Sequence, residues 1–252
     1  AYLAGYASAG MTTTGTLAVV GGERDNVTSS QMSAFSQGVD AYNLANGTSI
    51  TVLGWNPVTS DGTYAGSADE VRTATADAIS QGADIIAPFA GEANEGAARA
   101  VTEAANPIVR LVWSGLTKND LKGLTRDEAQ SAETAPMSGQ SGATVTQQVD
   151  TQSFADAFSY IQISDEVRSA IGAPVLTGVV VDYKAAMDTL IAQAAAGEKA
   201  SVVPVSLASG GVILTGFGAY TPMLSSELKL GLSDMAGQIE TGGMVISTPF
   251  DV

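Results

Sequence analysis

An apolar run that ends at two adjacent glycines is the feature that most restricts what this chain can fold into. Residues 17–20 read Leu-Ala-Val-Val, Gly21 and Gly22 follow, and a helical pattern carries Phe35, thirteen residues after Gly22, and then Gly38. A buried strand that turns into a helix forms a corner at its carboxyl end, where ligands of open α/β sheets bind. The corner carries the tetrapeptide Glu-Arg-Asp-Asn rather than a phosphate-binding loop. The sequence therefore predicts the edge of a pocket after residue 20.

Apolar runs of strand length alternate with helical patterns through residue 113. Within each run, the apolar residues are not interleaved with polar ones, which is typical of strands buried on both faces of a parallel sheet. They cover residues 17–20, 50–53, 84–89 and 109–113. Three helices are expected between them: the first is capped by Ser29 or Ser30, the second opens with Ser67 and Glu70 at capping-box spacing, and the third covers residues 94–105. This order predicts an α/β fold with a Rossmann-like, doubly wound parallel sheet.

A long polar stretch interrupts the second half of the chain. Residues 118–157 are dominated by Ser, Thr, Gln, Ala and acidic residues, which is typical of an insertion or a long surface loop. Strand patterns return at residues 160–163 and 175–181, and a last helix is expected near residues 225–240. Between them lies a helix whose apolar stripe consists of Met187, Leu190, Ile191 and Ala194.

Composition excludes several kinds of chemistry. The 252 residues include neither cysteine nor histidine, so no Ser-His-Asp triad, Cys-His pair, CxxC redox site or histidine zinc site can form. We expect no cofactor, no metal and no catalytic residue. The 26 acidic residues against 11 basic ones give a net charge of −15, which disfavours nucleic acid as a partner.

Segments spread over most of the chain carry a family resemblance. They are Tyr2-Leu3-Ala4-Gly5, residues 14–22, Phe35 with Gly38, residues 82–91, Val175-Leu176-Thr177, Gly210-Gly211-Val212 and residues 240–249. In order and spacing they resemble the basic membrane protein family, the purine nucleoside receptor-like solute-binding lipoproteins of bacterial ABC importers. The resemblance implies a type I periplasmic-binding-protein-like fold, in which two Rossmann-like lobes close on a ligand.

The resemblance also implies how the chain is divided. Residues 1–172 would form a carboxy-terminal-type lobe with a polar insertion at about 118–157, residues 173–200 would belong to the amino-terminal lobe, and residues 201–252 would cross back with a closing strand and helix. Aligned this way, the chain starts at the first crossing and lacks most of the amino-terminal lobe. The stripe that begins at Met187 then needs a partner sheet, because leaving it in water would forfeit roughly 1.5 to 3 kcal/mol per large side chain.

Family members stack a base on aromatic rings and hold the ribose with an Asp and a Lys. Carried over to this chain, the stacking Phe falls on Gln31, whose amide cannot supply the same stacking. The Asp falls on Ser114 or on Asp165, and we prefer Asp165 for its distance from the 175–177 segment. The Lys falls on Val181, with Lys184 one turn later. These departures count against purine nucleoside specificity.

Three further residues are candidate ligand contacts by position. Gly91 and Glu92 follow a buried strand near a helix amino terminus, where free N–H groups can bind a polar ligand. The alternative for Glu92 is that it only interacts favourably with the helix dipole. Trp113 ends a strand, so it either stacks on a base or sugar ring or caps the core.

The function predicted from these patterns is ligand binding rather than catalysis. We expect an extracytoplasmic receptor, periplasmic or anchored as a lipoprotein, that acts as a monomer and delivers a small polar, nucleoside-like ligand to an ABC permease. Two alternatives stay open. One is a carboxylate-based hydrolase on the same fold, although adjacent acids such as Asp165 and Glu166 seldom converge on one bond. The other is a ligand-free scaffold or adhesion protein, which the lost Phe and Lys counterparts favour.

Overall fold

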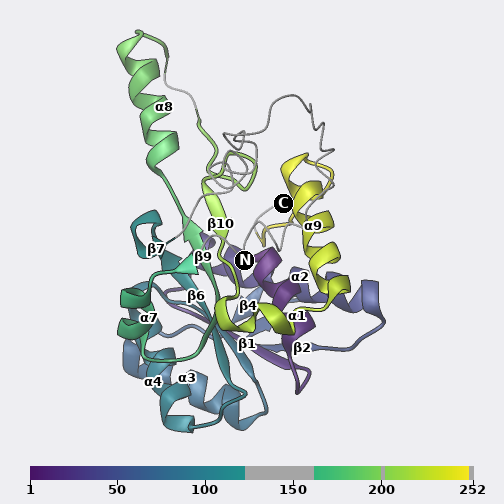
Figure 1. The fold of residues 1–252 in the computed structure, drawn as a ribbon. Coiled ribbons are helices and arrows are strands. Elements are labelled where there is room, and N and C mark those ends of the chain that lie inside the picture. The colour runs from purple at the N-terminus through teal and green to yellow at the C-terminus, as the bar shows by residue number, and fades with distance from the viewer. Residues whose placement is uncertain (123–161, 200–201, 250–252) are drawn as a thin grey trace, which may run out of the picture.

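A six-stranded sheet forms the centre of the computed structural model, which describes residues 1–122, 162–199 and 202–249 (Figure 1). The strand order is β10-β9-β6-β5-β1-β2. The strands are β1 (Thr16–Gly21), β2 (Thr51–Leu53), β5 (Ile85–Phe89), β6 (Arg110–Leu116), β9 (Val175–Val181) and β10 (Val212–Leu214). The first five pair in parallel, and β10 runs antiparallel to β9. The predicted α/β architecture with a mostly parallel sheet is confirmed.

Helices cover both faces of the sheet. One face packs against α1 (Tyr2–Met11), α2 (Asn26–Asn46) and α9 (Ser226–Glu240), and the other against α3 (Ala68–Ser80), α4 (Asn94–Ala104) and α7 (Asp165–Ile171). In β1, Leu17 and Val19 belong to the first core, whereas Ala18 and Val20 belong to the second. Strict alternation between two buried faces is the reason that β1 reads as an unbroken apolar run.

The helix boundaries follow local capping. Ser67 accepts the backbone N–H of Glu70 and caps α3, as predicted. The expected cap of α2 at Ser29 or Ser30 is wrong, because α2 starts earlier at Asn26 and its cap is Asp25, whose carboxylate accepts the N–H of Thr28 at 2.7 Å. Extended backbone at Asp25 turns that carboxylate toward the free N–H groups of the first turn.

Two glycines bring α1 and α2 into contact along their backbones. A Cβ atom at Gly5 would lie 2.0 Å from the carbonyl oxygen of Phe35, and one at Gly38 would lie 2.0 Å from that of Tyr2. Only residues without a side chain allow this approach. The contact holds α2 against the sheet, with its amino terminus at the carboxyl end of β1.

Short elements complete the described parts of the chain. They are β3 (Trp55–Asn56), β4 (Asp61–Gly62), β7 (Leu121–Lys122), β8 (Gln162–Ile163), η1 (Gly91–Ala93), η2 (Lys118–Asp120) and η3 (Gly218–Met223). Of the predicted polar insertion, residues 123–157 lie outside the described residues, as do residues 160–161 of the strand expected at 160–163.

Helix α8 (Lys184–Ala195) extends away from the sheet and its covering helices (Figure 1). Met187 and Ile191 of this helix are exposed, at 53% and 62% of their full accessible surface, and Leu190 between them is half-buried. None of the helices in the described ranges is both long and apolar enough to cross a membrane.

Candidate functional site

The strand order makes the carboxyl ends of β1 and β5 the point where the chain connections of the sheet diverge. From β1 the chain passes through α2 to β2 on one side, and it returns through α3 to β5 on the other side of β1. Connections that leave two neighbouring strands in opposite directions open the crevice in which α/β proteins bind ligands. We call this place the β1/β5 corner; residues 21–25, 29–31, 64–65 and 89–94 build it.

Backbone contacts make the corner rigid. The N–H of Gly22 donates to the carbonyl oxygen of Phe89 at 3.1 Å, and the N–H of Ala65 donates to that of Gly21 at 2.9 Å. A Cβ atom at Gly22 would lie 3.0 Å from the Cα of Ala90, and one at Gly21 would meet side chains at 2.7 to 2.9 Å. The two glycines that mark the corner in the sequence are therefore needed for close approach of three chain segments.

An aromatic ring at this corner was not anticipated from the sequence. The backbone of Tyr64 forms an isolated parallel β-bridge with Gly21, at the end of β1. The Tyr64 hydroxyl lies 2.8 Å from the Oγ of Ser29. The Arg24 guanidinium lies 5.8 Å from the centre of the Tyr64 ring and 3.5 Å from Asp61. A half-buried ring flanked by hydroxyls and a guanidinium can stack on a planar ligand and bind its polar edge.

A buried polar network supports the corner from the β5 and β6 side. The Oδ1 of Asn94 accepts the N–H of Ala90 at 2.8 Å, and its amide donates to the Oγ of Ser114 at 3.1 Å. The Ser114 hydroxyl in turn donates to the carbonyl oxygen of Pro88 at 2.6 Å. Because Ser114 is committed to these internal hydrogen bonds, it holds strand ends together.

Three predicted site residues share the carboxyl edge of the sheet. Gln31 is half-buried in the second turn of α2, and Gly91 and Glu92 are exposed in η1 directly after β5. Gly91 has a φ of +59°, a left-handed conformation that favours glycine. The acid at Glu92 precedes α4 and so also suits the positive end of that helix.

The other three predicted residues lie elsewhere. The Trp113 side chain lines a hollow of about 640 Å³ between α4 and α7, and none of the residues that build the corner lines it. Asp165 opens α7 and pairs with Lys122, and the hydrogen bond and charge of Lys122 lower the pKa of this carboxyl. Lys184 opens α8, and the hydrogen bond with Asp188 raises its pKa. The structure thus brings three of the six candidates to the corner.

The described parts of the chain contain no group of side chains that could coordinate a metal ion. Within residues 1–122, 162–199 and 202–249, no three acidic side chains gather closely enough to hold an ion. What the corner offers is hydrogen-bonding groups, an aromatic face and rigid backbone, which suits noncovalent binding of a small ligand.

Comparisons with known proteins identify a similar family and similar folds. Residues 1–119 match the family model described as ABC transporter substrate-binding protein, PnrA-like. This match confirms the family resemblance over those residues. No curated protein matches the chain.

Three solved structures share the fold of nearly the whole chain. A solute-binding protein of an ABC transporter system from Conexibacter woesei DSM 14684 has 14% identity and a TM-score of 0.57 over 98% of this chain and 62% of its own. One from Aeropyrum pernix K1 has 15% identity and a TM-score of 0.59 over 99% and 65%. A transcriptional activator of the comK gene from Bacillus halodurans has 13% identity and a TM-score of 0.58 over 98% and 63%.

These similarities confirm the expected fold, that of the periplasmic binding proteins. At identities of 13 to 15% they concern the fold alone. The chain spans 62 to 65% of the length of these three structures, which is less than two thirds.

Proposed function

Since residues 1–119 match the PnrA-like substrate-binding proteins of ABC transporters, we propose that this chain is part of an extracytoplasmic solute receptor. It binds a small polar ligand and delivers it to an ABC permease, without covalent chemistry. The monomeric state and a location in the periplasm or on a lipid anchor belong to the same proposal.

The observation that carries the proposal is the β1/β5 corner. Backbone hydrogen bonds join the two glycines of the corner to Phe89 and Ala65, so a bound ligand orders little additional structure. Tyr64 offers the aromatic face that Gln31 cannot, and Arg24 and Ser29 offer polar groups beside it. This combination suits a planar ring with a polar edge, and we therefore propose a nucleoside-like ligand. Gln31, Gly91 and Glu92 would be further contacts.

The division of the chain into lobes is a second part of the proposal. We infer that α8 belongs to a different lobe from residues 1–172, whereas β9, which the sequence assigned to that other lobe together with α8, is a strand of the same sheet as β1, β5 and β6. The exposure of Met187 and Ile191 supports this, because apolar side chains on a projecting helix are stabilised when another surface covers them. Lobe closure over the corner would then bring Lys184, at the start of α8, toward the ligand.

Calorimetric titration with a panel of purine and pyrimidine nucleosides tests the proposed ligand. We expect binding heat with at least one nucleoside, and Tyr64→Leu should weaken it by about 5- to 150-fold, since stacking on an aromatic ring contributes about 1–3 kcal/mol per base. Tyr64→Phe, which keeps the ring, is the matched control and should retain most of the affinity.

Two outcomes would contradict the proposal. If no nucleoside gives heat and none changes the melting temperature, a scaffold without a ligand is favoured, because a ligand at a hundred times its Kd should stabilise the protein by about 2.7 kcal/mol. If the incubated nucleoside is consumed and a product accumulates, the hydrolase alternative is correct.

A further inference from the structure

A hollow on the outer flank of the lobe has no part in the proposed receptor site. It measures about 640 Å³, within the range of about 300–1,000 Å³ that is usual for small-molecule sites. Its floor comes from β6 and its two walls come from α4 and α7. The residues that matter below are Trp113 on the floor, Glu95, Arg99 and Glu103 on α4, and Val167 and Ile171 on α7.

The floor presents an indole ring toward the solvent. Trp113 is half-buried, and the pairing of β6 with β9 shifts register between Trp113 and Leu116. Such irregularities are frequent beside binding sites. Trp113 itself follows the alternation of β6, because it packs on the same face of the sheet as Leu111 and Val112 packs on the other. The neighbouring Gly115 is exposed, with a φ of +82° and no atom within 4 Å of where a Cβ would be. An apolar ring face is thereby left beside open space, next to the apolar wall of α7.

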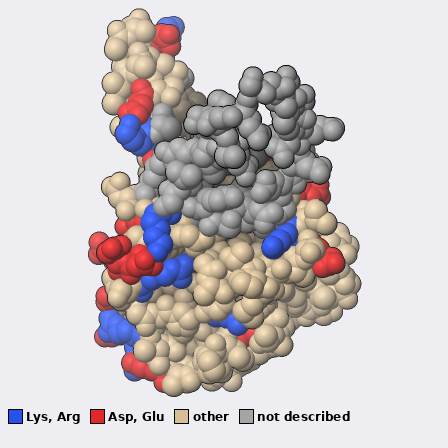
Figure 2. Space-filling view, in the orientation of Figure 1, with Lys and Arg blue, Asp and Glu red and all other residues tan. Residues whose placement is uncertain are grey.

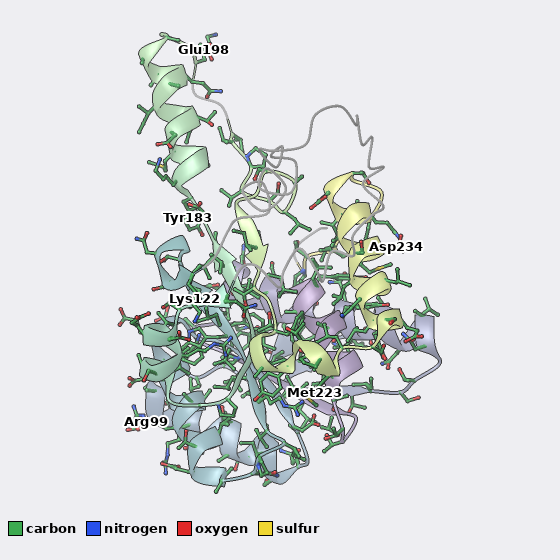
Figure 3. All side chains as sticks on the ribbon, viewed as in Figure 1. Arg99, Lys122, Tyr183, Glu198, Met223 and Asp234 are labelled. Carbon is green, nitrogen blue, oxygen red and sulfur yellow. The ribbon has the colours of Figure 1, made fainter. Side chains whose placement is uncertain are left out.

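The opposite wall is polar, and its charges are already paired. Arg99 Nη2 lies 2.7 Å from Glu95 Oε1, and Arg99 Nη1 lies 3.6 Å from Asp69 on α3. A carboxylate oxygen of Glu103 accepts a hydrogen bond from the Nε of Arg72 at 2.8 Å. Acidic and basic side chains accordingly lie side by side on the flank of α4 and α7 (Figure 2), where Arg99 is labelled on the outer side of α4 (Figure 3).

Pairing of this kind selects for a ligand without charge. A charged ligand would have to disrupt an existing ion pair, and the net charge of −15 repels anions. A guanidinium has five N–H donors and a carboxylate about four acceptor positions, so these groups can bond to hydroxyls and keep their partners. Held in place by the ion pairs, the donors and acceptors are also preorganised.

We propose that the hollow between α4 and α7 is a second binding site, which takes a neutral polyhydroxylated ring, that is, a sugar. The apolar C–H face of the ring stacks on Trp113, and its hydroxyl edge bonds to Glu95 and Arg99. Val167 and Ile171 cover the other side of the ring. This site is separate from the β1/β5 corner and stands whether or not the corner binds a nucleoside.

The two tryptophans of the chain provide the test. Trp55 is buried against the opposite face of the sheet, so Trp55→Phe leaves Trp113 as the single indole fluorophore. We expect glucose, galactose, xylose or cellobiose to shift the Trp113 emission and protect it from iodide quenching, saturably and with a Kd below about 1 mM. Arg99→Met should weaken this response at least about tenfold. Arg24→Met, a matched change at the corner, should leave it unaltered.

Three results would overturn the proposal. They are no saturable response to any of the four sugars, a response to choline but to no sugar, and a sugar response that survives both Arg99→Met and Ala170→Trp, which fills the hollow. If Trp55→Phe does not fold, the difference between the intact protein and Trp113→Phe measures the same response. If Trp113→Phe still gives binding heat with nucleosides, the receptor site at the corner is independent of the hollow, and a negative sugar result does not affect it.

Discussion

The substitution Gly38→Ala tests whether the backbone contact between α1 and α2 holds this lobe together. The added Cβ would lie 2.0 Å from the carbonyl oxygen of Tyr2, whereas ordinary contact begins at 3.4 Å. The obstacle is backbone, which cannot rotate away as a side chain can. The two helices must therefore separate by about 1.4 Å, more than the gap of about 0.5–1 Å that already forfeits a quarter to a half of the dispersion energy of a contact.

The cost follows from how much α1 buries. Nine of its ten residues are buried, so a shift of α1 weakens packing along the whole helix. Overpacking of this kind typically costs about 1–3 kcal/mol, occasionally more, and we expect the upper end of that range. The better helix propensity of alanine returns only about 1 kcal/mol. A net loss of about 2 kcal/mol corresponds to a melting temperature lower by about 4–8 °C in a chain of this size.

Equilibrium unfolding in urea and thermal melts, both followed by far-UV circular dichroism, measure the effect. Gly237→Ala in α9 is the matched control, because a Cβ there would have no atom within 4 Å and the substitution should stabilise by about 0.5–1 kcal/mol. If Gly38→Ala proves as stable as Gly237→Ala, the described contact between α1 and α2 is wrong.

Three further predictions concern the Asn94 network, the cap of α2 and the ion pair at the start of α7. Asn94→Ala should cost about 1–3 kcal/mol in urea unfolding, since it removes the hydrogen bonds to the half-buried Ala90 N–H and to the buried Ser114 hydroxyl, whereas the exposed Asn106→Ala should cost less than about 1 kcal/mol; equal costs would refute the network. Asp25→Ala should cost about 1 kcal/mol near neutral pH. The Thr28 N–H lowers the Asp25 pKa, so this stabilisation is present above the usual Asp pKa of about 3.9 and lost as the pH falls through the lower folded value. Stability curves against pH that stay parallel for the two proteins would contradict it, and Asp25→Asn should keep the cap. Lys122→Met should raise the Asp165 pKa toward its usual value in an NMR titration, whereas Lys199→Met should not, and an unchanged Asp165 pKa would exclude the ion pair.

Elements with a clear apolar pattern could be predicted, and α1 could not. The run at residues 17–20 identifies β1 because both of its faces are buried, so each residue is apolar. Helix α1 is buried nearly all round and built from Tyr, Leu, Ala, Gly and Ser, so it lacks the one-sided apolar stripe by which surface helices are recognised. The cap of α2 was missed because Ser29 matches cap preferences as well as Asp25 does, and only the fold directs Ser29 toward Tyr64.

By itself, the sequence determined the alternation of strands and helices, the glycine corner after β1, and the absence of histidine and cysteine chemistry. These depend on local periodicity and residue type. Only the tertiary structure decided that β5 lies beside β1 and that Tyr64 pairs with Gly21 at the corner. It also decided that Trp113 faces α4 and α7, because Leu111 and Trp113 lie on the face of the sheet that these helices cover, whereas Val112 lies on the other face. Strand order and pairing register arise from contacts between distant segments, which local patterns do not encode.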